Sequence, residues 1–206
     1  AFYDNGRGIS ADKDMRKAIN ELQKKGNLKG LIIDIRNNGG GFLSQAVKIA
    51  GLFVPKGVIA IAKFSNGEVQ YSRDIDGRLF YSGPLVVLTS KGSASASEVI
   101  AQALQDYNAA IIVGDEYSYG KGSMQYQNIT DPNAAHYFKV SIGRYYTISG
   151  KTPQLEGVKS DIVVQSEYAP YKLGERYLQY PLSRDHLGFS FTDPKNPLYK
   201  VSGVDQ

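Results

Sequence analysis

Cysteine is absent from the 206 residues, and only two histidines, His136 and His186, are present. The absence of cysteine excludes disulfides, thiol nucleophiles and cysteine-bound metals. Neither histidine belongs to a metal-ligand spacing, so we expect no metal and no cofactor. The sequence also lacks an apolar run long enough for a membrane span, and no signal peptide opens it.

The charge is modest. A net charge of +4 is spread along the chain rather than gathered in runs, which gives weak grounds for nucleic-acid binding. The length is sufficient for one good-sized core. Because the first residues lack an initiator methionine and begin abruptly, we expect an excised, N-terminally truncated fragment.

Strands and helices alternate along the first 164 residues. Apolar, β-branched runs at 31–35, 84–88 and 111–113 are typical of buried strands, and helical spacing follows Ser10, Gly41 and Ser95. A tight-turn signal at Asn66-Gly67 joins a strand at 58–64 to one at 69–72, and further strands are expected at 137–146 and 161–164. This order predicts an α/β core.

The character of the sequence changes after about residue 166. Tyrosines and prolines are scattered without helical or strand periodicity, among them Tyr168, Tyr199, Pro194 and Pro197. We therefore expect two parts: a core at 1–164, and an irregular C-terminal extension at 165–206 that packs on it.

The segment 89–98 lies between a predicted buried strand and a predicted helix. Ser95 and Glu98 fit a capping box, and the local pattern alone favours this structural interpretation. The alternative is chemical, because the first residues of such a helix expose free N–H groups and the positive end of the helix dipole. A serine alkoxide or an oxyanion is well stabilised there.

Two further loops follow predicted strands. Gly39-Gly40-Gly41 leaves the backbone bare, which suits one donor of an oxyanion hole, a phosphate nest or a flexible connection. The lysine and serine of a P-loop are missing. Lys121 lies between Gly120 and Gly122, and it can serve as a base for a serine if burial or nearby positive charge keeps it neutral. We expect the three loops to converge at one sheet edge.

Several motifs in this order resemble the C-terminal processing proteases, also called tail-specific proteases. They are Asp34-Ile35-Arg36-Asn37-Asn38-Gly39-Gly40-Gly41, Gly92-Ser93-Ala94-Ser95-Ala96-Ser97-Glu98, Gly120-Lys121-Gly122-Ser123-Met124-Gln125 and Arg144-Tyr145-Tyr146-Thr147. The resemblance covers residues 1 to about 164. It implies a crotonase/ClpP-like α/β fold of stacked strands and helices. Two departures stand out: the loop 115–119 is one residue longer than usual, and the PDZ-like domain that normally precedes this core has no counterpart within these 206 residues.

The resemblance also implies roles for single residues. Ser95 matches the nucleophile, Lys121 the general base, and Gln125 the residue that positions the lysine. The backbone N–H groups of Ala96 and of Gly40 or Gly41 match the oxyanion hole. Two carboxylates, Glu98 and Asp106, match positions that support the site.

The expected function is a serine endopeptidase with a Ser/Lys dyad that cleaves proteins recognised through their C-terminal tails. Its partners would be protein or peptide substrates, with no nucleic acid and no metal, and assembly into a homo-oligomer is left open. The expected location is the bacterial periplasm or cell envelope. Two alternatives remain: a catalytically inactive peptide-binding module on the same fold, and an acyl-CoA enzyme on the related fold.

Overall fold

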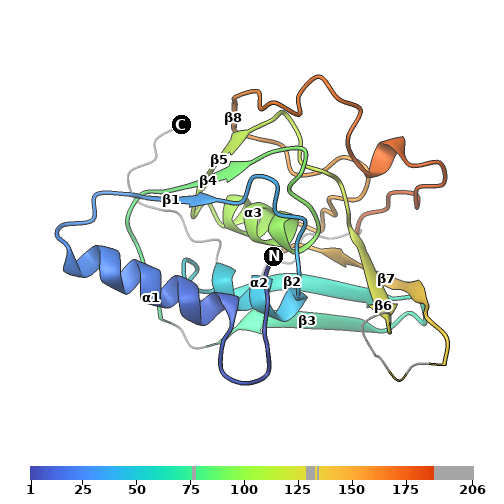
Figure 1. The fold of residues 1–206 in the computed structure, drawn as a ribbon, viewed down its shortest axis with the longest axis horizontal. Coiled ribbons are helices and arrows are strands. Elements are labelled where there is room, and N and C mark those ends of the chain that lie inside the picture. Colours follow the sequence, from blue (N-terminus) through green and yellow to red (C-terminus); the bar gives the residue numbers. More distant parts are fainter. Residues whose placement is uncertain (76–77, 129–132, 134, 188–206) are drawn as a thin grey trace.

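The computed structural model describes the whole chain except residues 76–77, 129–132, 134 and 188–206. Its described part contains two four-stranded sheets, with α2 and α3 between them (Figure 1). The helices are α1 (Ala11–Lys24), α2 (Leu43–Ala50) and α3 (Ala96–Asp106), with a short 3-10 helix η1 at Glu175–Tyr177. The strands are β1 (Leu31–Asp34), β2 (Gly57–Phe64), β3 (Val69–Asp74), β4 (Leu85–Thr89), β5 (Ile111–Gly114), β6 (Ser123–Gln127), β7 (Lys139–Tyr146) and β8 (Ile162–Val163). The predicted α/β fold of stacked strands and helices is confirmed.

The first sheet is parallel, with strand order β1-β4-β5-β8. Asp34 near the end of β1 pairs with Leu88 of β4, which pairs with Val113 of β5. Since the strands run in the same direction and in register, the loops that follow β1, β4 and β5 leave from one edge. These are the glycine, serine and lysine loops that the sequence places after buried strands.

The second sheet is antiparallel, with strand order β3-β2-β7-β6. The predicted hairpin across Asn66-Gly67 is present as β2 and β3. The strand predicted at 137–146 begins at Lys139. Strand β6 starts two residues after Lys121 and lies at an edge of this sheet, so it carries Gln125 past the lysine loop.

Helix α3 is buried on all sides, because it packs between the two sheets (Figure 1). Val99, Ile100 and Leu104 are fully buried, as the apolar spacing predicts. Helix α2 ends at Ala50, with Gly51 as its C-cap, so Phe53 lies beyond the helix. Phe53 is nevertheless buried, since the turn after the helix keeps its ring in the core.

Residues 165–187 contain no regular element except η1, and they contact the loops that carry the candidate site. The carboxylate of Asp115 accepts the backbone N–H of Ser166 at 2.7 Å, and Lys91 Nζ donates to the carbonyl oxygen of Ala169 at 2.6 Å. Pro194, Pro197 and Tyr199 of the expected extension lie outside the described residues. Within the described part, none of the helices has the length and apolar character needed to cross a membrane.

Candidate active site

Ser95 immediately precedes α3, and its backbone has φ +57° and ψ −117°. A non-glycine residue in such a region stores about 1–3 kcal/mol of strain, which the surrounding contacts must hold. The backbone N–H of Ser95 donates to Glu98 Oε2 at 2.8 Å, so the glutamate half of the predicted capping box is made. The structural and chemical interpretations of this segment are therefore compatible.

A cavity of about 420 Å³ lies against Ser95. Its walls come from the glycine loop, the start of α3, the lysine loop and strands β6 and β7, as the expected convergence requires. The lining residues are Gly39, Gly41, Phe42, Leu43, Phe64, Ser95, Ala96, Val99, Lys121, Ser123, Met124, Gln125, Gln127, Lys139, Ile142 and Tyr145.

Lys121 is half-buried in this cavity, and its Nζ donates to Gln125 Oε1 at 3.0 Å. Burial, followed by the positive charge of Lys139, lowers the pKa of the Lys121 amine, while Glu175 and Glu98 oppose this shift. Among the hydrogen bonds of the described residues, none joins Lys121 Nζ to Ser95 Oγ. Both residues line the same cavity.

Glu98 is fully buried and connects the serine loop to the lysine loop. Its Oε2 accepts the N–H of Lys121 at 2.8 Å in addition to that of Ser95, and its Oε1 accepts the N–H of Gly120 at 2.6 Å and the Ser118 hydroxyl at 2.5 Å. Burial raises the pKa of Glu98 to about 7, although these hydrogen bonds act in the opposite direction. One carboxylate thus joins two loops that are distant in the sequence.

The glycine loop lies against the serine loop. Gly40 has φ +104°, and a Cβ there would come within 2.8 Å of the Ala94 carbonyl oxygen, so a side chain does not fit. Its N–H donates to Asn38 Oδ1 at 3.1 Å. In the described part of the chain, the N–H of Gly41 has no such partner, and Ala96 is the first residue of α3, whose N–H lacks an intrahelical acceptor.

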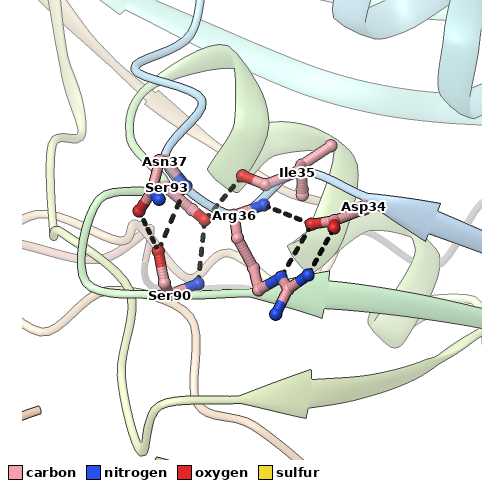
Figure 2. Close-up of polar contacts among 6 residues, drawn as sticks. All are labelled: Asp34, Ile35, Arg36, Asn37, Ser90 and Ser93. Atoms are coloured by element: carbon pink, nitrogen blue, oxygen red, sulfur yellow. Dashed lines mark hydrogen bonds and ion pairs between the residues drawn. The ribbon is translucent and has the colours of Figure 1, made fainter. Parts of the chain in front are cut away.

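A network of buried polar groups fastens the glycine loop to the end of β4 (Figure 2). The Ser93 hydroxyl donates to the Ile35 carbonyl oxygen at 2.8 Å and accepts the N–H of Ser90 at 2.9 Å. Ser90 Oγ accepts the N–H of Asn37 at 3.1 Å. Sequence reasoning missed this network, since Ser90 and Ser93 carry no signal beyond their place beside the Ser95 motif.

The other members of the glycine motif point elsewhere. Arg36 forms an ion pair with Asp34 at 2.7 Å, and about half of each side chain is exposed (Figure 2).

Asp106 is the last residue of α3, at the end of the helix opposite Ser95. Its Oδ2 accepts a hydrogen bond from the Ser149 hydroxyl at 2.7 Å, which connects α3 to the turn after β7. Asp106 thus contacts the fold around the site rather than the cavity.

Two further cavity residues escaped the sequence analysis. Lys139 is exposed at the start of β7 and acts electrostatically on Lys121. Tyr145 is buried on the same strand and belongs to the Arg144-Tyr145-Tyr146-Thr147 motif, which the resemblance marks without assigning it a role. A spacing pattern cannot reveal either residue, because β7 reaches the cavity only through pairing between strands distant in the sequence.

Comparison with known proteins finds relatives of this chain among the C-terminal processing proteases. The chain is 37% identical over 175 residues to a carboxy-terminal-processing protease of Bartonella bacilliformis, covering 82% of this chain and 38% of that protein. It is 38% identical over 162 residues to a chloroplastic C-terminal processing peptidase of Tetradesmus obliquus, covering 77% and 33%. The solved photosystem II D1 C-terminal processing protease superposes with a TM-score of 0.66 at 34% identity, covering 76% and 39%.

These alignments cover well under half of each relative. The family model described as Peptidase family S41 matches residues 2–164, which include every motif that lines or supports the cavity. The chain therefore belongs to Peptidase family S41.

Proposed function

We propose that the protein containing this chain is a serine peptidase in which Ser95 is the nucleophile and Lys121 the general base. One observation carries the proposal: in a chain of this family, the two residues line one cavity, and the same oxygen of Glu98 accepts both of their backbone N–H groups. The lowered pKa of Lys121 favours the neutral amine that such a base needs.

In this mechanism, Ser95 Oγ attacks the scissile carbonyl carbon while Lys121 Nζ takes the hydroxyl proton. The tetrahedral intermediate collapses to an acyl-enzyme, and the protonated Lys121 donates its proton to the departing amine. Water, activated by the same lysine, then hydrolyses the ester and restores Ser95. Gln125 holds the amine between these steps through its 3.0 Å hydrogen bond.

The oxyanion is assigned to the N–H groups of Ala96 and Gly41. Both residues line the cavity. The N–H of Gly40 donates to Asn38 Oδ1, whereas that of Gly41 has no acceptor among the described residues. Gly40 has the different task of letting the two loops approach closely. Each donor of this kind contributes about 10²–10³ to kcat.

The substrates we propose are proteins cleaved near their C-terminal ends, because the matched relatives carry C-terminal processing in their names. The proposed location remains the bacterial cell envelope, in a family that also has a chloroplastic member. Substrate selection would involve parts of the whole protein beyond the segment that this chain aligns with.

The test is the hydrolysis of unfolded β-casein by the full-length protein and its Ser95→Ala and Lys121→Ala variants. Both changes should abolish cleavage, whereas Ser65→Ala and Lys24→Gln, at exposed positions, should not. A serine-reactive probe should label the wild type and not the Ser95→Ala variant. Cleavage by Ser95→Ala at the normal rate would disprove the assignment.

The second candidate is a peptide-binding module without activity. It is favoured by one observation, the lack of a Lys121–Ser95 hydrogen bond among the described residues, although catalytic contacts often tighten only when substrate is bound. This module would bind unfolded peptide equally well in the wild type and the Ser95→Ala variant, and neither would cleave it or react with the probe.

A further inference from the structure

Tyr145 lies near the end of β7, and only 2% of its surface is exposed. Its hydroxyl donates toward two backbone carbonyl oxygens, that of Ser95 at 3.0 Å and, at closer range, that of Lys121. A phenol has a single hydrogen, so the two carbonyls share it. The backbone N–H of Tyr145 also donates to the Gly122 carbonyl oxygen at 3.0 Å.

The other side of the same two residues is held by Glu98. Its Oε2 accepts the N–H of Ser95 and that of Lys121, each at 2.8 Å. The serine and lysine loops are therefore bridged twice, through their N–H groups by one carboxylate oxygen and through their carbonyl groups by one phenol. Two bridges with separate anchors, on α3 and on β7, fix the separation and the relative orientation of the loops.

Resting on the function proposed above, we propose that Tyr145 is a positioning residue for the Ser95–Lys121 dyad, because its hydroxyl bridges the backbone carbonyls of both. The Ser95 carbonyl also accepts the N–H groups of Glu98 and Val99, at 2.8 and 3.0 Å. Among the hydrogen bonds of the described residues, the Lys121 carbonyl accepts from Tyr145 alone. Loss of the phenol should therefore loosen the lysine loop more than the serine turn.

Burial, followed by the charges of Glu98 and Glu175, raises the pKa of Tyr145 well above its ordinary value, so the O–H stays available as a donor throughout the working range of pH. A loosened Lys121 would be better solvated, and its pKa would rise toward that of a free lysine. Loss of the Tyr145 hydroxyl should thus lower the rate and also shift its pH dependence. A general loss of stability would not shift the pH–rate profile of the protein that remains folded.

The next residue supplies a matched control. Tyr146 is fully buried, and its hydroxyl donates to Asp185 Oδ1 at 2.6 Å, away from the cavity. Successive residues of a strand point to opposite faces, so Tyr145→Phe and Tyr146→Phe each remove one buried hydroxyl from opposite sides of β7. Only the first change removes the bridge.

The experiment compares the full-length wild type with both variants for β-casein cleavage and thermal unfolding. We expect Tyr145→Phe to lower kcat by about 10- to 100-fold with KM nearly unchanged, since a misplaced reacting group costs this much. The rising limb of its pH–rate profile should move to higher pH. Tyr146→Phe should keep the wild-type kcat and profile at a comparable loss of thermal stability.

Incorporation of 4-aminophenylalanine at position 145 restores a donor and should recover most of the activity. This variant tests the need for a hydrogen-bond donor at position 145 even if Tyr145→Phe does not fold. The proposal is overturned if Tyr145→Phe matches Tyr146→Phe in rate and pH profile, or if the amino variant folds and stays inactive. If Ser95→Ala and Lys121→Ala also retain wild-type activity, the dyad itself fails; if they are inactive while Tyr145→Phe is normal, only the bridge fails.

Discussion

The backbone N–H of Lys121 donates to the carboxylate of Glu98 at 2.8 Å, so a side chain from the first turn of α3 holds the loop that carries the candidate base. The same carboxylate is fully buried. Its charge state therefore affects both the stability of the fold and the geometry of the site.

The first prediction concerns stability and pH. Burial raises the pKa of Glu98 from 4.5 to about 7. Between these two pH values, Glu98 is protonated in the folded protein and ionised in the unfolded chain. The stabilisation that this group gives is present below pH 4.5 and is lost as the pH rises toward about 7. Thermal unfolding of the full-length protein should show a larger loss of stability between pH 5 and pH 8 in the wild type than in Glu98→Gln.

Glu21→Gln is the control, since Glu21 is exposed on α1. It should follow the wild-type pH dependence. Equal pH dependence in the wild type and Glu98→Gln would contradict a buried, proton-binding Glu98.

The second prediction concerns the charge beside the base. The positive charge of Lys139 helps to lower the pKa of Lys121. Lys139→Gln removes this charge, so the pKa of Lys121 should rise and the rising limb of the kcat/KM profile for β-casein should move to higher pH. Lys24→Gln, on the last turn of α1, should leave the profile in place. A shift to lower pH in Lys139→Gln would show that the lysine is not the titrating base.

Much of the parallel sheet could be predicted because its signals are local. The runs at 31–35, 84–88 and 111–113 are apolar enough to be buried strands, and each leads directly into a loop with glycine or serine. The parallel edge rule then brings Gly41, Ser95 and Lys121 together, and the structure places all three on one cavity. The family resemblance then implied which residue is the nucleophile, which is the base and which supply the oxyanion hole.

The contacts that hold the site together could not be predicted, because they join positions far apart in the sequence. Tyr145 reaches the cavity through the pairing of β7 with β2 and β6, which no short pattern specifies. The longer loop at 115–119 gave no sign that Ser118 binds Glu98 and accepts the N–H of Val158 at 2.7 Å. The sequence indicated only a helix cap for Glu98. Three of the four groups that donate to its carboxylate belong to the lysine loop, at least 20 residues away in the sequence, and no local pattern predicts them.

The third prediction separates two neighbouring glycines. Gly40→Ala forces a Cβ to within 2.8 Å of the Ala94 carbonyl oxygen at φ +104°, and it should cost about 1–3 kcal/mol while lowering kcat, because the glycine and serine loops must move apart. A Cβ on Gly39 meets nothing within 4 Å, so Gly39→Ala should unfold at nearly the wild-type temperature. Equal stability of the two variants would mean that the close approach at Gly40 does not exist in solution.

The last prediction concerns the polar network in Figure 2. Ser93 is 1% exposed, and its hydroxyl serves the Ile35 carbonyl and the Ser90 N–H at once. Ser93→Ala leaves the buried N–H of Ser90 without this acceptor, whereas the Ile35 carbonyl keeps the N–H of Asn38 at 3.1 Å. The loss should lower the free energy of unfolding by about 1–3 kcal/mol. Because Ile35 begins the loop that leads to Gly41, kcat should fall as well, with little change in KM.

Ser65→Ala provides the comparison, since Ser65 is exposed in the β2–β3 turn and its loss should change stability by less than about 0.5 kcal/mol. Chemical denaturation and β-casein hydrolysis measure the two effects separately. A stable Ser93→Ala variant with reduced kcat would assign the hydroxyl to positioning alone. An unstable variant with normal kcat would show that the glycine loop keeps its place without the Ser93 hydroxyl. The loop would then be held by Ser97 Oγ of α3 and by the N–H of Ala94 in the serine loop, which donate to the Asn38 carbonyl oxygen at 2.7 and 3.1 Å.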